Sequence, residues 1–246
     1  AGTRVMPESG RWWDDINQQT SNMVGIVKHS NEGKTWESRY SNSYGDNIIP
    51  VVITDGVFFV IHKERIKKEF NKKVRGFHFY DIDFTFRNHL EGVKVGVITD
   101  TRITHLSMGQ TNEEWEKNRE LFVERYKGDL PSEVPVEIFY TNKVPYIKNE
   151  PKLSIIVPTK DNIDILFGCL TSIEEKTKYV NYEILVADTG SSEENLKKIR
   201  EFCDSRLTVK LIEYDYYNFA QINNEVVRDH VSEDTELLLF CNNDIE

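Results

Sequence analysis

The stretch LSIIVPT, residues 153–159, decides the fold of this chain. A short apolar run that is rich in β-formers and ends at a proline and a threonine is typical of a buried strand in a parallel sheet. A helical pattern follows from Asn162 to Lys176. Its apolar side chains fall on one helix face, at Ile165, Leu166, Cys169, Leu170 and Ile173. The stretch therefore predicts the first strand and the first helix of an α/β domain.

The same alternation of strand and helix continues to the end of the chain. Further strands are predicted at 182–187, 207–214 and 237–240, and further helices at 195–202 and 222–231. Short elements that alternate in this way form a mostly parallel sheet with helices on both faces. Residues 151–246 are therefore predicted to form an α/β unit.

The first 130 residues have a different pattern, with many aromatic side chains and less regular spacing. Strands are predicted at 23–28 and within 48–62, and an amphipathic helix at 112–126. Residues 131–150 contain Pro131, Pro135 and Pro145 between short apolar pieces, which is typical of a linker. The predicted organisation is one unit over 1–130, a linker over 131–150 and a second unit over 151–246.

Net charge and hydropathy limit the classes of partner. The net charge of −10 argues against a broad nucleic-acid interface, which needs clustered Lys and Arg. A nucleotide diphosphate remains a candidate ligand, because a metal ion and a few backbone N–H groups can hold it. No apolar run reaches the roughly 18–20 residues of a bilayer span. We therefore expect a chain that acts on small ligands rather than on nucleic acid.

The cysteines and the N-terminus give expectations about location and completeness. Cys169, Cys203 and Cys241 are odd in number and widely spaced, which suggests neither a disulfide framework nor a metal site of the CxxC type. We expect a reducing, cytoplasmic location, with the inner face of the membrane as an alternative. The start at Ala1 has no leader pattern and reads as sequence from the middle of a domain. A fragment of a longer protein is therefore expected.

Three of the predicted strands end in polar, turn-forming residues, at 158–161, 188–190 and 242–244. In an open parallel sheet, ligands bind at the carboxyl ends of the strands. A carboxylate there can accept hydrogen bonds from a base or ribose, and another acid can hold a divalent cation that also binds a diphosphate. Loop and cap chemistry explains any one of these motifs alone. All three on consecutive strands favour a nucleotide site.

These motifs also carry a family resemblance. The segments SIIVPT (154–159), DTGS (188–191), YNF (217–219), INN (222–224) and NND (242–244) occur in this order. Together they resemble the nucleotide-binding half of family 2 glycosyltransferases, which have the Rossmann-like GT-A fold. The resemblance covers residues 152–246 almost continuously.

The resemblance implies roles for the strand-end residues. Thr159 and Asp188 would contact the nucleobase and ribose, with Pro158, Asn242 and Asn243 beside the nucleotide sugar. Asp244 would be the last acid of the family's Asp-x-Asp motif and would hold Mn2+ or Mg2+. The chain departs from the motif at its first position, because Asn242 stands where the family has an acid.

The first unit resembles the acceptor side of the same fold, in TDGVFF (54–59), GFHFYDID (76–83) and Arg87. Asp81 takes the place of the family's general base and Tyr80 that of the preceding Glu, with Asp55, Gly56 and Tyr80 near the acceptor. A carboxylate on a half-enclosed aromatic ledge can be desolvated and made more basic, which agrees with this role. The alternative is that Asp81 only favours the start of a helix, for which Asp83 would serve equally well.

Two further assignments stay open between function and structure. His105, in RITH (102–105), matches a histidine that completes the metal shell in many relatives, and imidazole is a reasonable ligand for Mn2+. A lone histidine is also often structural. Trp12, Trp13 and Trp36 either stack on sugars or fill the core, because a Trp buries a large apolar area.

The two resembling halves occur in reversed order, with the acceptor half before the nucleotide half. The chain is therefore expected to be either a fragment of a tandem protein or a circular permutant. A helix and a strand expected between the halves are missing, and open sheet edges tend to pair with another chain. We expect weak activity alone or self-association.

By this resemblance the chain is an inverting glycosyltransferase that uses a nucleotide-diphosphate sugar. Its acceptor would be a glycan or glycolipid of the cell surface, with peripheral membrane association. One alternative is a non-catalytic module that binds a nucleotide sugar or a glycan. Another is a nucleotidyltransferase, which would need a loop rich in Gly, Arg and Lys after the first strand. Residues 158–162 lack such a loop.

Overall fold

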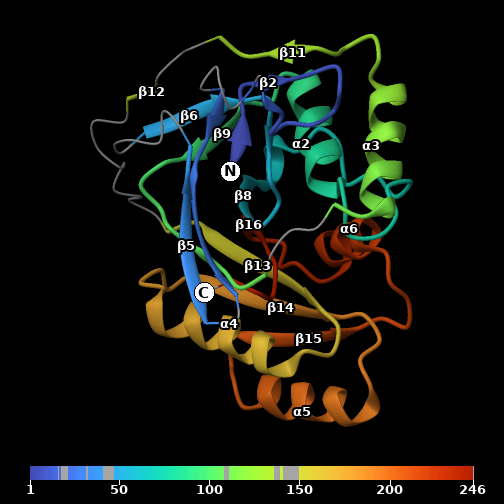
Figure 1. The fold of residues 1–246 in the computed structure, drawn as a ribbon. Coiled ribbons are helices and arrows are strands. Elements are labelled where there is room, and N and C mark those ends of the chain that lie inside the picture. The colour runs from blue at the N-terminus through green and yellow to red at the C-terminus, as the bar shows by residue number, and fades with distance from the viewer. Residues whose placement is uncertain are drawn as a thin grey trace. The chain divides into compact units, whose positions relative to one another are not determined.

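The computed structural model describes residues 1–15, 17, 22–31, 33–40, 47–107, 111–135, 139–140 and 150–245. The protein is mixed α/β (Figure 1) and divides into two compact units. Unit 1 consists of Ala1–Asp55 and Lys73–Tyr146, and unit 2 of Gly56–Lys72 and Ile147–Glu246. Within the described ranges, no helix has the length and apolar character needed to cross a bilayer. The predicted α/β class is confirmed.

Unit 2 is built on one sheet of five strands in the order β15-β14-β13-β16-β8. The strands are β13 (Lys152–Thr159), β14 (Tyr182–Asp188), β15 (Val209–Glu213), β16 (Thr235–Cys241) and β8 (Phe58–His62). The first four are parallel, and β8 pairs antiparallel with β16. Apolar side chains fill the centre of the sheet, with Ile156 and Leu185 inaccessible to solvent. The mostly parallel sheet predicted from the sequence is therefore confirmed.

Three helices connect these strands: α4 (Ile163–Lys176), α5 (Glu193–Asp204) and α6 (Phe219–Asp229). Helices α4 and α5 lie side by side (Figure 1), with the rings of Phe167 and Phe202 stacked at 4.2 Å. The chain steps from β13 to β14 to β15 in one direction and then returns through α6 to β16. Because crossovers are right-handed, α6 covers the opposite face of the sheet. The helical connections thus change from one face of the sheet to the other between β13 and β16. In open parallel sheets, ligands bind at this position.

Unit 1 consists of several small sheets in its described part. The strands are β1 (Gly2–Thr3), β2 (Val5–Met6), β3 (Met23–Val24), β4 (Ile26–Asn31), β5 (Lys34–Arg39), β6 (Asn47–Val51), β7 (Ile53–Thr54), β9 (Val95–Ile98), β10 (Thr104–His105), β11 (Ser132–Glu133) and β12 (Phe139–Tyr140). They pair as β3-β1-β7, β10-β4-β5, β11-β2 and β12-β6-β9. Each sheet is too small to form a core alone, so the unit depends on packing between them.

Two helices complete unit 1, α2 (Tyr80–Leu90) and α3 (Glu113–Arg125). Asn112 caps α3 by accepting a hydrogen bond from the N–H of Trp115 at 2.9 Å, which confirms the helix predicted at 112–126. An aromatic cluster joins the helices, with ring centroids about 5 Å apart; its members are Phe79, Phe86, Trp115, Phe122 and Tyr126. This cluster is the part of the core that supports α2.

The structure differs from the sequence prediction in two stretches. The apolar run 48–62 forms three strands, and the third of them, β8, joins the sheet of unit 2. The predicted linker 131–150 contains β11, which pairs with β2, and β12, which pairs with β6. The remainder of that linker, at 136–138 and 141–149, lies outside the described residues. The domain boundaries assigned from the sequence stay a prediction.

Candidate active site

Asp188 ends β14 and is 1% exposed. Its carboxylate accepts hydrogen bonds from the N–H groups of Gly190 and Ser191, both at 3.1 Å, and from the Ser191 hydroxyl. Gly190 has a φ of 92°, a backbone conformation that side chains disfavour. The turn after β14 therefore holds the Asp188 carboxylate in a fixed position, so this acid has a structural role whatever ligand it meets.

Thr159 joins the ends of three strands. Its carbonyl accepts from the N–H and the hydroxyl of Thr189, at 2.9 and 3.0 Å, which ties β13 to the turn after β14. Its hydroxyl accepts from the side-chain amide of Asn243 at 3.1 Å, which ties β13 to the end of β16. The three predicted strand ends thus meet beside the position between β13 and β16 at which the helical connections change faces.

Asp161, which belongs to the polar strand end predicted at 158–161, and Asn162 shape the loop after β13, although neither was assigned a role in the site. Both have left-handed backbone angles, with φ of 51° and 44°. The Asp161 carboxylate accepts from the N–H of Ser192 at 2.9 Å and from the Asn195 amide at 2.8 Å. These two hydrogen bonds lower the pKa of Asp161. The available signal was the Asp-Asn dipeptide, since these residues tolerate this conformation best.

Asn242 follows β16, and its backbone makes several hydrogen bonds. Its N–H donates to the carbonyl of Val57 at 3.2 Å, and its carbonyl accepts from the buried thiols of Cys241 at 3.3 Å and Cys169 at 3.7 Å. The hydrogen bond with Cys169 and burial raise the pKa of the Cys241 thiol. The NND motif therefore starts from a rigid position, and Asp244 follows it in a half-buried turn.

A divalent cation at Asp244 is compatible with the side chains present. Within the described residues, no group of three or more His, Cys, Asp or Glu side chains gathers into a metal site. Mg2+, however, is commonly held by one or two carboxylates and completed by substrate phosphates. The single half-buried carboxylate of Asp244 fits a site of that kind.

In unit 1, Asp81 and Asp83 lie in the first turn of α2 but have different surroundings. Asp83 is 1% exposed and binds the Arg125 guanidinium at 2.6 Å and the Tyr126 hydroxyl at 3.0 Å, which ties α2 to α3. Burial and the charge of Asp83 raise the pKa of Tyr126. Asp81 is 7% exposed, and its Oδ1 accepts from the N–H of Ile82 at 2.8 Å. The two acids are therefore not equivalent, because Asp83 connects two helices.

The other predicted acceptor-side residues lie near the start of α2 or at a unit boundary. Tyr80, the first residue of α2, is 3% exposed and so belongs to the core. Asp55 follows β7, and the Thr54 N–H before it donates to the Thr85 hydroxyl of α2 at 3.3 Å. Asp55 ends the first segment of unit 1, whereas Gly56 begins unit 2.

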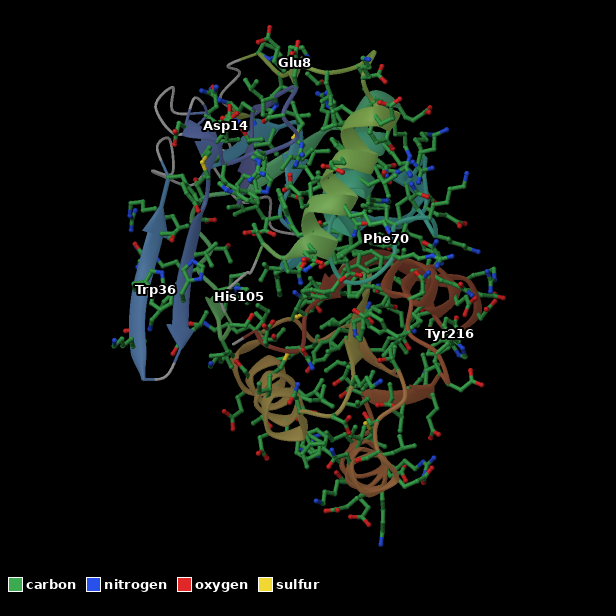
Figure 2. The ribbon with its side chains drawn as sticks, turned by 45° about the vertical axis from the view of Figure 1, so that its right-hand side comes forward. Glu8, Asp14, Trp36, Phe70, His105 and Tyr216 are labelled. Atoms are coloured by element: carbon green, nitrogen blue, oxygen red, sulfur yellow. The ribbon has the colours of Figure 1, made fainter. Side chains whose placement is uncertain are left out.

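His105 lies in β10 of unit 1, and its Nε2 is 3.1 Å from the Ser107 hydroxyl. Its ring centroid is 6.1 Å from that of His29. Of the tryptophans considered as sugar-stacking residues, Trp12 is 6% exposed and Trp13 packs against Trp12 and Trp115. Trp36 is 39% exposed (Figure 2). The core interpretation is therefore correct for Trp12, and Trp36 remains available at the surface.

Comparison with known proteins gives two family matches, relatives and a solved structure. Residues 1–126 match the family described as "Glycosyltransferase like family", and residues 154–242 match "Glycosyl transferase family 2". The "O-antigen biosynthesis protein RfbC" of Myxococcus xanthus is 36% identical over 113 residues, which are 46% of this chain and 8% of that protein. The "Uncharacterized protein y4gI" of Sinorhizobium fredii is 29% identical over 102 residues, 41% of this chain and 11% of that protein.

One similar solved structure is a mannosyltransferase, PcManGT from Pyrobaculum calidifontis, in complex with GDP-Man and Mn2+. It is 22% identical with a TM-score of 0.32, covering 46% of this chain and 32% of that one. The chain thus spans about a tenth of the curated relatives and a third of the structural one. Since the first family match covers more than half of the 246 residues, and the second confirms the resemblance of residues 154–242 to family 2, the protein belongs to the glycosyltransferase-like family.

Proposed function

We propose that this chain forms the catalytic part of an inverting, metal-assisted glycosyltransferase. It would transfer a sugar from a nucleotide-diphosphate sugar to a glycan or glycolipid in cell-surface polysaccharide synthesis. The observation that carries the proposal is the convergence of the ends of β13, β14 and β16, through the hydrogen bonds of Thr159 to Thr189 and Asn243. The O-antigen relative supports the polysaccharide context.

The nucleotide would bind at this convergence point. Asp188 and Thr159 are the proposed contacts of the base and ribose, with Pro158, Asn242 and Asn243 around the diphosphate sugar. Their loops are already tied together by hydrogen bonds, so little conformational entropy remains to be lost when a nucleotide binds. A pre-organised site of this kind is what transition-state stabilisation requires.

Asp244 is the proposed metal-holding carboxylate. A bound Mn2+ or Mg2+ would supply positive charge to the departing diphosphate. Asn242 contributes no negative charge where the related motif has an acid. We therefore expect a metal affinity that depends strongly on the nucleotide diphosphate, because its phosphates complete the coordination.

Asp81 is the proposed general base, and Asp55, Gly56 and Tyr80 are the proposed acceptor-side residues. Asp81 takes the proton of the acceptor hydroxyl while the acceptor oxygen forms a bond to the anomeric carbon. The bond from that carbon to the diphosphate oxygen breaks in the same step, and the nucleotide diphosphate leaves. One displacement of this kind inverts the configuration. The separate engagement of Asp83 with Arg125 supports the choice of Asp81.

For the reversed order of the two halves that the resemblance implies, we favour a tandem parent protein over a circular permutant. The relatives are about ten times longer than the matched segments, as a protein with several modules would be. The pairing of β8 with β16 shows that a strand from the first part of the chain can complete the sheet of the second. The proposal therefore includes a sheet shared between the halves.

A non-catalytic binding module is the second candidate function, and Asn242 is the observation that favours it. Loss of one acid from the metal motif weakens catalysis more than it weakens binding of the base and ribose. Saturable nucleotide binding without turnover of the corresponding nucleotide sugar would select this candidate. Turnover that requires Mn2+ would exclude it.

Isothermal calorimetry with UDP, dTDP and GDP, each with and without Mn2+, tests the proposed function. We expect one nucleotide to bind in a metal-dependent manner, and Asp244→Asn to weaken that binding by about tenfold or more. Asp234→Asn is the matched control, because Asp234 is exposed and pairs with Lys152 at the opposite end of β16. A cooperative thermal transition without binding of any of the three nucleotides would contradict the proposal.

A further inference from the structure

An aromatic row crosses the small sheet β10-β4-β5 of unit 1. His105 of β10 lies opposite His29 of β4, and His29 lies opposite Trp36 of β5. Residues directly opposite each other in neighbouring strands point to the same face of a sheet, so all three rings share one face. The Trp36 and His29 rings are stacked, with centroids 5.2 Å apart and an interplanar angle of 15°. Figure 2 shows Trp36 and His105 on the outer strands of this sheet.

The opposite face of the same sheet has a different character. Lys28 lies opposite Glu37 there, and Glu37 pairs with Arg39 at 2.8 Å and with Arg102 at 3.9 Å. Charged groups on a thin sheet are stable in water and need no partner molecule. The row of Trp36, His29 and His105 is therefore the face of this sheet that is suited to a ligand.

Trp36 is not a core residue. It is 39% exposed, whereas Trp12 and Trp115 are 6% and 5% exposed. An indole ring buries a large apolar area when it is packed, so an exposed one loses much of that stabilisation. The His29 ring nevertheless stacks against one face of the indole and supports it. A rigid, exposed aromatic surface with polar groups beside it is the kind of surface that binds amphipathic ligands.

We propose that the face formed by Trp36, His29 and His105 binds a sugar ring of the glycan acceptor. A pyranose has an apolar face of C–H groups, which fits against an indole, and a rim of hydroxyls. The imidazole nitrogens of His29 can donate hydrogen bonds to those hydroxyls or accept hydrogen bonds from them. The Ser107 hydroxyl, 3.1 Å from His105 Nε2, holds that ring and adds a polar group. Calling this sugar the acceptor rests on the proposed function.

The charge of Asp55, in the same unit, acts on this face. Burial lowers the pKa of His29, as does neighbouring His105, and the charge of Asp55 opposes both effects. Burial and then Asp55 raise the pKa of Tyr40. A glycan bound at Trp36 would lie on the same unit as Asp55 and the proposed base Asp81.

Nuclear magnetic resonance of the full chain labelled with 15N tests this site. The indole N–H signals of its four tryptophans would be followed during separate titrations with L-rhamnose, N-acetylglucosamine and the methyl glycosides of mannose, glucose and galactose. We expect the Trp36 signal alone to shift and to saturate with at least one sugar, with a dissociation constant of about 1–10 mM. If no sugar moves the Trp36 signal, or if all four signals move together without saturation, the inference is wrong.

Variants separate a stacking role from a structural one. Trp36→Leu should abolish the sugar-induced shifts of the His29 and His105 ring signals. Trp36→Phe, which keeps a ring, should weaken binding by about three- to tenfold. Glu37→Gln, on the charged face, is the matched control and should bind as the unaltered chain does. Equal sugar binding by Trp36→Leu and Glu37→Gln would overturn the inference.

The result is distinguishable from a failure of the proposed function. The nucleotide titration uses variants of unit 2, Asp244→Asn and its control Asp234→Asn. The sugar titration uses variants of unit 1, at Trp36 and at its control position Glu37. Nucleotide binding without sugar binding at Trp36 would overturn only the sugar site. Sugar binding at Trp36 without nucleotide binding would support the sugar site and contradict the glycosyltransferase proposal.

Discussion

The two units position their polar side chains in different ways. In unit 2, one continuous sheet brings distant parts of the chain together, and local turns then orient the side chains. Asp188 is held by N–H groups two and three residues further along the chain. In unit 1, Asp83 is held by Arg125 and Tyr126, which are 42 and 43 residues away. Unit 1 therefore places Asp83 through tertiary packing, whereas unit 2 places Asp188 through backbone N–H groups of the next turn.

This difference has a consequence for mutation. A substitution in a turn of unit 2 should change ligand affinity more than stability, because the surrounding sheet stays intact. A substitution in the helix pair of unit 1 should change stability and placement together, because the same side chains do both. Asp81 lies in the same helix turn as Asp83, and its Oδ1 accepts from the neighbouring Ile82 N–H, so the two acids can be compared directly.

The largest effect is expected for Asp81→Asn. The amide cannot take a proton from the acceptor, so turnover should fall by about 10²–10⁴-fold. Nucleotide affinity should stay within about twofold, because Asp81 belongs to unit 1. Steady-state release of nucleotide from the sugar donor and calorimetry with the nucleotide measure the two quantities. Unchanged turnover would exclude Asp81 as the base.

Asp83→Asn should reduce stability instead. The change removes the buried negative charge of Asp83 that pairs with the Arg125 guanidinium, and it weakens the hydrogen bond from Tyr126. The expected cost is about 2–3 kcal/mol of unfolding free energy. Urea unfolding followed by tryptophan fluorescence measures the loss. Asp129→Asn, at an exposed position of the same unit, is the control and should unfold as the unaltered chain does. A variant at Asp83 as stable as that control would show that α2 and α3 do not depend on this contact.

The acid response of unit 2 should depend on Glu183. Burial by itself raises its pKa, but hydrogen bonds from Lys210, Ser154 and Ser232 outweigh burial and lower the pKa from 4.5 to about 2. A depressed carboxyl pKa stabilises the folded state above pH 4.5, and this stabilisation is lost as the pH falls toward 2. Glu183→Gln should therefore show a smaller drop in melting temperature between pH 5 and pH 3. An identical drop in both proteins would contradict the assignment.

The elements of unit 2 were predictable because its pattern is local. Every strand and helix predicted within 151–246 is present, and the errors concern only the ends. Helix α6 begins at Phe219 rather than at Ile222, because Asn218 caps it through the N–H of Gln221. Strand β15 begins after Leu207, which is fully exposed and so has no place in a buried strand. End effects of this kind depend on single caps that periodicity does not detect.

The candidate site was predictable only in part. The convergence of the strand ends followed from the topology of parallel sheets, and the hydrogen bond between Asn243 and Thr159 agrees with it. The roles of Pro158, Thr159, Asp188, Asn242, Asn243 and Asp244, and those of Asp55, Gly56, Tyr80, Asp81 and His105, stay predictions. The aromatic row was not predictable, because the pairing of His29 with both Trp36 and His105 depends on a register that joins residues about 75 apart.

The smallest effects come from a matched pair of helix caps, one in each unit. Asn112 caps α3 with a 2.9 Å bond, and Ser192 caps α5 with a longer bond of 3.4 Å. Replacing either by Ala should cost about 0.5–2 kcal/mol, with the larger cost at Asn112 because its hydrogen bond is shorter. If the units unfold separately, calorimetry should show two transitions, and each variant should lower only one of them. Should both variants lower one common transition equally, the chain unfolds as a single cooperative structure and the two units are not independent in stability.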